Sequence, residues 1–110
     1  MKSTYVKIAV FVPEANADDV RQALGDAGAG KLENGLYSHC TFSTKGMGRF
    51  LPLADANPYI GGVGRLEAVP EERIETICLR SVLPKAIQAM KAAHPYEEVA
   101  YDVWSVEDPL

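Results

Sequence analysis

A short segment near the end of the chain gathers side chains that can bind ligands. Residues 94–98, which we call the turn, read His-Pro-Tyr-Glu-Glu. One imidazole, one phenol and two carboxylates therefore fall within five positions. Pro95 fixes its own φ and disfavours the helical conformation at His94, so a preceding helix must end there. The turn is the first candidate for a binding site.

Two interpretations of the turn fit the sequence. In the first, His94 with Glu97 or Glu98 binds a divalent metal such as zinc or copper, since imidazole and carboxylate ligands suit these ions. Two ligands from one short segment do not make a tight site, so other ligands must complete it. In the second, His94 only hydrogen-bonds the last helix carbonyls, and both glutamates are solvated.

The elements that must position the turn repeat once along the chain. Alternating apolar residues predict strands at residues 5–12, 37–42, 74–80 and 99–106. Helical spacing predicts one helix from an Asn16 cap to Gly28, and another from a Ser81 cap to His94 with Pro84 in its first turn. This β-α-β-β-α-β order predicts a single α+β domain over residues 1–110, a ferredoxin-like sandwich. Both helices should cover one face of an antiparallel sheet, with the second and fourth strands at its edges.

The other face of the sheet is predicted to be apolar. Tyr5, Ala9 and Phe11 alternate toward it, and we expect Tyr37 and His39 to lie there as well. Because a face rich in aromatic residues is poorly suited to water, we expect it to be buried between the subunits of a homo-oligomer. A mixed, solvated face is the alternative.

A glycine- and proline-rich arm, about residues 46–64, separates the two central strands. Five glycines and two prolines lie between Lys45 and Arg65. Long ordered excursions in a small domain are often functional or take part in assembly. Gly46 and Gly48 permit a ligand to approach the backbone closely, but they do not form a phosphate-binding fingerprint. A glycine-rich β-arm without a ligand is an equal alternative.

The predicted topology brings the arm and the turn to the same end of the sheet. Arg49 and Arg65 could then reach the glutamates of the turn or an anionic ligand. The candidate ligand-binding residues at this end are Gly46, Gly48, Arg49, Arg65 and Tyr96.

Two further candidate metal ligands, His39 and Cys40, are predicted at the opposite end of the sheet. They alternate to opposite faces of their strand. A metal site that combines them with His94 would therefore need a neighbouring chain to supply part of the shell.

Composition narrows the class of function. The net charge of -4 and the pI of about 5.1 do not fit a nucleic-acid-binding surface. No stretch approaches the ~20 apolar residues of a membrane span, and no signal-peptide pattern opens the sequence. The alternating strand contexts of Cys40 and Cys78 suit buried, reduced thiols, so we expect a cytoplasmic location. Because no nucleophile elbow, histidine pair or spaced cysteine cluster is present, we predict no catalytic residue.

These motifs resemble two groups of proteins. The fold order and the Pro-Tyr-Glu-Glu core of the turn look like the CutA divalent-cation-tolerance proteins, trimers related in shape to PII signalling proteins. A more specific resemblance is to the domain inserted in bacterial members of a dinuclear-metal family, the GTP cyclohydrolase I type 2 homologues. The segments that carry it are Gly35-x-Tyr37-Ser38-His39-Cys40-x-Phe42, Gly46-x-Gly48-x-Phe50-x-Pro52, Asn57-Pro58-x-Ile60-Gly61, Glu67-x-Val69, Arg73-Ile74-Glu75 and Ala93-His94-Pro95-Tyr96-Glu97-Glu98-x-Ala100-Tyr101-Asp102.

The resemblance implies a fold more directly than an activity. In that family the metal-binding His, Asp and Glu clusters lie in flanking segments that this sequence does not contain. The resemblance therefore implies a non-catalytic, oligomeric binding or regulatory module, a trimer or a multiple of one, with a ligand or metal site between subunits. The alternative is an accessory part of a dinuclear-metal enzyme carried on another chain. A third alternative is a purely structural role, which needs neither a ligand nor a partner enzyme.

Overall fold

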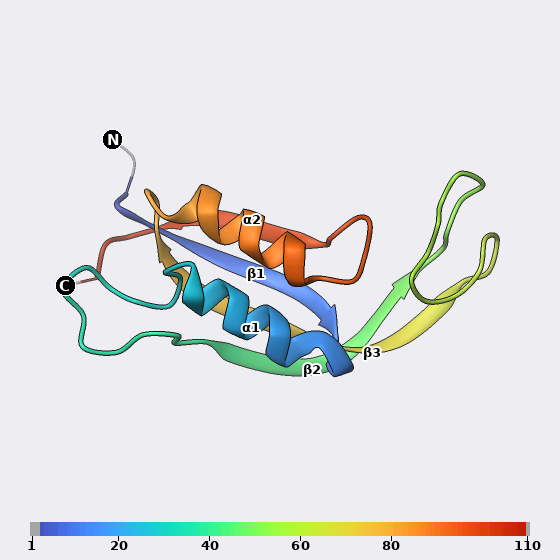
Figure 1. Cartoon of the computed structure of the whole chain (residues 1–110), viewed down its shortest axis with the longest axis horizontal. Coiled ribbons are helices and arrows are strands. Elements are labelled where there is room, and N and C mark those ends of the chain that lie inside the picture. The colour runs from blue at the N-terminus through green and yellow to red at the C-terminus, as the bar shows by residue number, and fades with distance from the viewer. Residues whose placement is uncertain (1–2, 110) are drawn as a thin grey trace.

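The chain folds into a four-stranded antiparallel sheet covered on one face by two helices (Figure 1). This computed structural model describes residues 3–109. Its strands are β1 (Tyr5–Pro13), β2 (Phe42–Phe50), β3 (Glu67–Leu79) and β4 (Tyr101–Val106). Its helices are α1 (Ala17–Asp26), which follows a single 3-10 turn at Glu14–Asn16, and α2 (Leu83–Ala93). The sheet order β2-β3-β1-β4 confirms the ferredoxin-like plan.

The hydrophobic core lies between the sheet and the helices. Alternate residues of β1 point into it, as the period of two in its sequence predicts. Full burial of a Val, Leu or Ile side chain stabilises a fold by about 1.5–3 kcal/mol relative to exposure. The largest fully buried side chains are Ile8, Leu24, Ile74, Met90, Val6, Val10, Val12, Val20 and Cys78.

The second strand lies later in the sequence than predicted. Residues 37–41 form no strand, and β2 begins at Phe42. Cys40 instead donates its backbone N–H to the carbonyl oxygen of Gly30 at 3.0 Å, which closes a loop over residues 31–39. β2 forms despite its two glycines because it pairs with β3 from end to end. Pairing with a neighbouring strand here outweighs the weak strand propensity of glycine.

The first five residues of the predicted arm therefore belong to β2. β3 is also longer than predicted, because it begins at Glu67 rather than at Ile74. β1 pairs with β3 only over residues 71–79, so residues 47–50 and 67–70 pair with each other alone. We call these two short runs the ribbon, and the loops at residues 51–66 the tip. Figure 1 shows the ribbon and tip projecting from the body of the molecule, at the end where the turn follows α2.

The helix ends were predicted in part. Asn16 occupies the N-cap position of α1, but its side chain makes no capping hydrogen bond. The N-cap of α2 is Val82 rather than Ser81, again without a side-chain cap, and Pro84 lies in the first turn as predicted. His94 ends α2 with an extended backbone, as its position before Pro95 requires.

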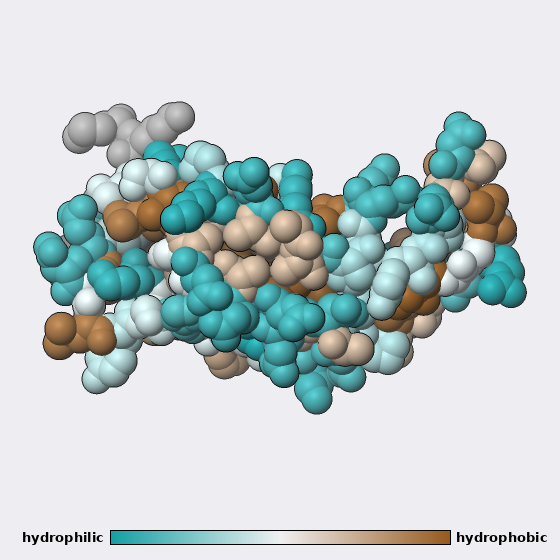
Figure 2. All heavy atoms as spheres, in the orientation of Figure 1, coloured by the Kyte–Doolittle hydropathy of each residue, from teal (hydrophilic) through white to brown (hydrophobic). Residues whose placement is uncertain are grey.

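The face of the sheet away from the helices is less apolar than predicted. Tyr5 and Ala9 are already buried within the chain. Phe11 lies under the Arg73 guanidinium, whose carbon is 5.5 Å from the ring centroid. Tyr37 and His39 do not line this face, because they belong to the loop before β2. Large exposed apolar side chains instead gather on the ribbon and tip, at Met47, Leu51, Leu53, Tyr59, Val63 and Leu66 (Figure 2).

Among residues 3–109, no helix has the length and apolar content that a membrane span requires.

Candidate functional site

A groove of about 1050 Å³ lies where the projecting ribbon and tip meet the turn. One wall comes from residues 47–60 and the other from Tyr96, Glu97 and Glu98. Phe11 and Glu71 contribute from the sheet. In Figure 2 the surface is hollowed where the arm leaves the body. The convergence expected from the topology is therefore present within a single chain.

Tyr96 is the central side chain of the groove. Its ring centroid is 5.7 Å from that of Phe50 in an edge-on arrangement, and 6.4 Å from that of Tyr59. The Tyr96 hydroxyl donates to Glu71 Oε2 at 3.3 Å. Burial, followed by the negative charge of Glu71, raises the pKa of Tyr96 to about 12. The phenol is therefore a neutral hydrogen-bond donor near neutral pH.

Glu71 is a buried carboxylate on β3, only 8 % exposed. The run Glu71-Glu72-Arg73-Ile74-Glu75 is typical of a solvated, charged start of a strand, and for Glu71 this interpretation is wrong. Its strand pairs with the glycines of β2, and Gly48 leaves the space that its carboxylate fills. A Cβ at Gly48 would lie 2.0 Å from Glu71 Oε1, whereas one at Gly46 would meet nothing within 4 Å. Of the two candidate glycines, only Gly48 is therefore required by a close contact.

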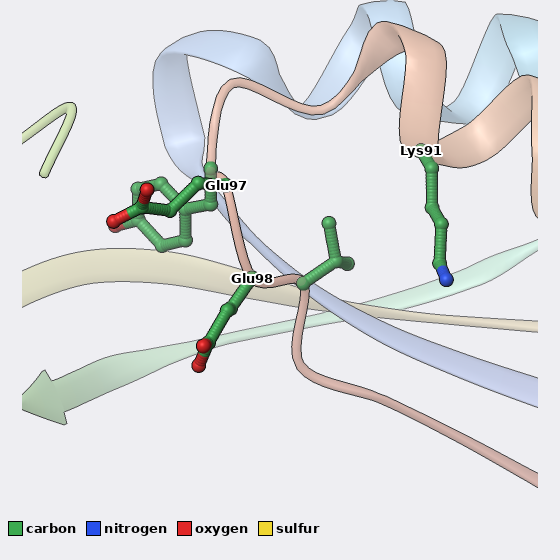
Figure 3. A pocket seen from close by; sticks show the side chains of 5 residues that line it. Lys91, Glu97 and Glu98 are labelled. Carbon is green, nitrogen blue, oxygen red and sulfur yellow. The ribbon is translucent and has the colours of Figure 1, made fainter. Parts of the chain in front are cut away.

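The two glutamates of the turn have different surroundings. Glu97 Oε1 accepts the backbone N–H of Asn57 at 2.8 Å and so ties the tip to the turn. Glu98 makes no hydrogen bond or ion pair within residues 3–109. In Figure 3 both carboxylates point away from the ammonium group of Lys91. The Lys91 Nζ lies 5.1 Å from the ring centroid of Tyr101 and forms no ion pair with either glutamate within residues 3–109.

His94 is a buried, neutral imidazole whose two ring nitrogens are both occupied. Its Nε2 is 2.8 Å from the carbonyl oxygen of Phe11, which can only accept, so Nε2 carries the hydrogen. Its Nδ1 accepts the backbone N–H of Tyr96 at 3.1 Å. Burial lowers the pKa of His94, against smaller opposing effects of the Phe11 carbonyl and Glu71. In this arrangement neither nitrogen is free to bind a metal.

The two candidate arginines do not reach the turn's glutamates. Arg65 Nη2 lies 3.5 Å from Glu67 Oε1, at the base of the tip. Arg49 lines the groove but forms no ion pair among the residues that the structure describes. The expected contact of these arginines with Glu97 or Glu98 is therefore absent from residues 3–109.

His39 and Cys40 lie far from the groove, at the opposite end of the sheet as predicted. His39 Nε2 is 2.9 Å from Asp26 Oδ1, at the end of α1, and its Nδ1 is 2.9 Å from the Ser38 hydroxyl. His39 holds the pKa of Asp26 below its ordinary value by this hydrogen bond. No local sequence pattern indicates this Ser-His-Asp contact, because Asp26 is 13 residues from His39 in the chain. All three side chains are open to solvent and none lines the groove. Cys40 is exposed as well, so its predicted burial is wrong, whereas Cys78 is buried.

The described part of a single chain, residues 3–109, contains no metal-binding cluster. Within residues 3–109, no three His, Cys, Asp or Glu side chains come close enough together to hold an ion. Any site that includes the turn's glutamates would need ligands from a second chain.

Comparison with known proteins places the chain beside one segment of much longer proteins. A protein of Bacillus subtilis named GTP cyclohydrolase 1 type 2 homolog is 54% identical over 101 residues, which are 92% of this chain and 26% of that protein. A protein of Mycobacterium tuberculosis with the same name is 43% identical over 103 residues. The resemblance to the GTP cyclohydrolase 1 type 2 homologues is confirmed. The chain spans about a quarter of the length of these relatives.

Solved structures agree with this assignment. A Bacillus cereus protein related to NIF3 superimposes with a TM-score of 0.81 at 50% identity, over 98% of this chain and 27% of that one. The Archaeoglobus fulgidus periplasmic divalent cation tolerance protein CutA gives a TM-score of 0.66 at 17% identity, over 96% and 87% of the two chains. A Bacillus subtilis GlnK–ATP complex gives 0.63 at 14% identity. The last two likenesses concern the fold alone. No protein-family model matches the chain.

Proposed function

We propose that the chain is a non-catalytic binding module that takes a small ligand in the groove between the arm and the turn. The observation that carries this proposal is the buried carboxylate of Glu71. It lies in an open groove with a tyrosine hydroxyl as its one hydrogen-bond partner among residues 3–109. Buried carboxylates ordinarily accept several hydrogen bonds or form an ion pair. No fully buried side-chain oxygen of residues 3–109 lacks a partner, so the second oxygen of Glu71 keeps access to the groove, where a ligand would donate a hydrogen bond to it.

We propose further that the module works as a homo-oligomer, a trimer or a multiple of one. The support is the group of apolar side chains on the ribbon and tip, which are 48–72 % exposed. A contiguous apolar surface on a monomer commonly marks an interface. The tip forms a wall of the groove, so an interface there would lie beside the ligand.

Native mass spectrometry on protein purified without a metal-chelating tag tests both parts. We expect a symmetric oligomer that retains a small molecule, and its mass would identify the ligand. A monomer without ligand under conditions that preserve known weak complexes would contradict the proposal. An oligomer without a bound small molecule would support the proposed assembly and contradict the proposed ligand binding.

A second candidate function follows from the length of the relatives. Since the chain matches about a quarter of each, it could act as an accessory part of a dinuclear-metal enzyme whose metal-binding residues lie on another chain. We also propose that the protein is located in the cytoplasm. Activity that appears only when such a chain is added to this one would favour this role over a self-sufficient binding module.

A divalent metal such as zinc or copper remains a competing ligand for the groove. It would have to use Glu97 or Glu98 together with residues of a neighbouring subunit, since His94 is engaged within its own chain. The same mass spectra would show the metal as a fixed mass increment that a chelator removes.

A further inference from the structure

The groove has a strong excess of negative charge. Its lining contains four carboxylates, those of Asp55, Glu71, Glu97 and Glu98, and one guanidinium, that of Arg49. Lys91 borders a smaller hollow beside Glu97 and Glu98, with its Nζ over the Tyr101 ring, so carboxylates still outnumber cations here. An anionic ligand such as a nucleotide or phosphate would meet repulsion from these carboxylates. The charge of the groove therefore selects for a cation.

The carboxylate of Glu71 favours a ligand that donates a hydrogen bond and carries a positive charge. Glu71 Oε1 has no donor within residues 3–109, and its Oε2 has only the Tyr96 hydroxyl at 3.3 Å, beyond the usual O–H···O distance. No fully buried side-chain oxygen within residues 3–109 lacks a partner, so Oε1 keeps access to the groove and is open to a donor. A ligand that carries N–H groups with a positive charge would form the strongest hydrogen bond with this carboxylate.

Aromatic side chains form the apolar part of the same groove. Tyr96 lies between Phe50 and Tyr59, with ring centroids 5.7 and 6.4 Å away. Tyr59 remains 60 % exposed, so its ring is open to a ligand. Faces of aromatic rings attract ammonium ions and also cover aliphatic carbon. A bare metal ion would gain little from such walls, whereas an organic cation would use them.

We infer that the ligand of this groove is an aliphatic ammonium ion, a primary or secondary amine of the polyamine type, with its N–H groups on Glu71 and its carbon chain against Tyr96 and Tyr59. This inference rests on the proposed function, because it names the class of ligand for the same groove. Glu97 and Glu98 would receive a second ammonium group toward the mouth of the groove, where they are exposed.

Titration of the full chain with spermidine tests the inference. The measurement is NMR of the ¹⁵N-labelled protein at near-physiological salt, which weakens loose binding of a polycation to an acidic protein. We expect saturable shifts of the backbone amides of Asn57 and Tyr96. Tetramethylammonium carries charge without N–H donors, and we expect it to bind about tenfold more weakly or worse.

A matched pair of variants separates the site from general electrostatics. Glu71→Gln keeps the shape of the side chain and removes its charge, and we expect it to weaken spermidine binding by about tenfold or more. Glu33→Gln makes the same change on an exposed loop away from the groove, and we expect less than about a twofold effect. Tyr59→Ala, in the exposed part of the tip, tests the aromatic wall without a change of charge and should also weaken binding.

Each outcome bears on the inference. Equal losses in Glu71→Gln and Glu33→Gln would overturn it, because binding would then follow net charge alone. The absence of amide shifts with any amine would also overturn it. Inorganic phosphate and a neutral diol are titrated in parallel. If either shifts the Asn57 and Tyr96 amides while spermidine does not, the groove remains a ligand site and only the ammonium assignment fails.

Discussion

The Nε2 of His94 donates a hydrogen bond to the carbonyl oxygen of Phe11 at 2.8 Å, which fastens the end of α2 to the end of β1. The other ring nitrogen accepts the N–H of Tyr96 and so fixes the backbone that carries the central side chain of the groove. His94 is therefore a positioning residue for the turn. Neither interpretation of the sequence predicted this contact: one gave His94 a metal ion as its partner, and the other the last carbonyls of its own helix.

Replacing His94 should destabilise the protein. His94→Ala removes two buried hydrogen bonds and leaves the Phe11 carbonyl without this donor, so we expect a loss of about 2–4 kcal/mol in the free energy of unfolding. Urea denaturation measures it. His39→Ala is the control, since its pair with Asp26 is exposed and should contribute less than about 1 kcal/mol. Equal losses in the two variants would contradict the assigned role.

Stability should fall in mild acid because of the same residue. Burial lowers the folded-state pKa of His94 below its ordinary value of 6.5. Below that pH the imidazole is protonated in the unfolded chain but not in the folded chain, so the free energy of unfolding decreases as pH falls. The urea midpoint should therefore decrease between about pH 7.5 and pH 5.5. His94→Gln cannot titrate there, and an unchanged pH dependence in this variant would show that other groups cause it.

The two glycines of β2 should respond differently to the same substitution. Gly48→Ala places a methyl group on the Glu71 carboxylate, which is the far end of a flexible side chain. We expect a modest loss of about 1 kcal/mol in stability, together with displacement of Glu71 and loss of ligand binding. The added methyl group of Gly46→Ala meets open space, so we expect stability and ligand binding to be unchanged within error. If Gly48→Ala retains binding, the position of Glu71 is not what the ligand recognises.

The tip should be required for assembly and not for folding. Replacing residues 51–66 by an Asn-Gly turn would connect β2 to β3 as a two-residue hairpin and remove Leu51, Leu53 and Leu66 from the surface. We expect a folded protein of lower oligomeric state by light scattering, with unchanged far-ultraviolet circular dichroism. A variant that keeps the parent oligomeric state would place the interface on the sheet face instead, near Trp104, which is 40 % exposed.

The fold could be predicted because its signals are local. The alternating residues of β1 and the His94-Pro95 stop each depend on neighbours in sequence, and both lie where predicted. β2 could not be predicted from its own residues, since glycines at 46 and 48 argue against a strand and only pairing with β3 makes one. The same long-range pairing buries Glu71, which the sequence presents as part of a solvated charge run.

The candidate site was predicted in outline for a similar reason. Strand order alone brings the arm to the turn, and Tyr96 was among the residues expected there. Glu71 and Tyr59 were missed because their roles depend on a side chain's direction across the sheet and on the path of the tip. Arg65 was expected near the turn, but the path of the tip leaves it beside Glu67.

The ribbon leaves the sheet at the point where β1 ends, so beyond Glu71 only two strands continue. Two-stranded ribbons without a third neighbour are weakly held against bending. The groove lies at the root of this ribbon, and the apolar side chains of the tip lie at its far end. On the proposal that the groove takes a ligand and the tip contacts another subunit, a change at Glu71 and Tyr96 would move the tip. Ligand binding and assembly would then be coupled through the ribbon.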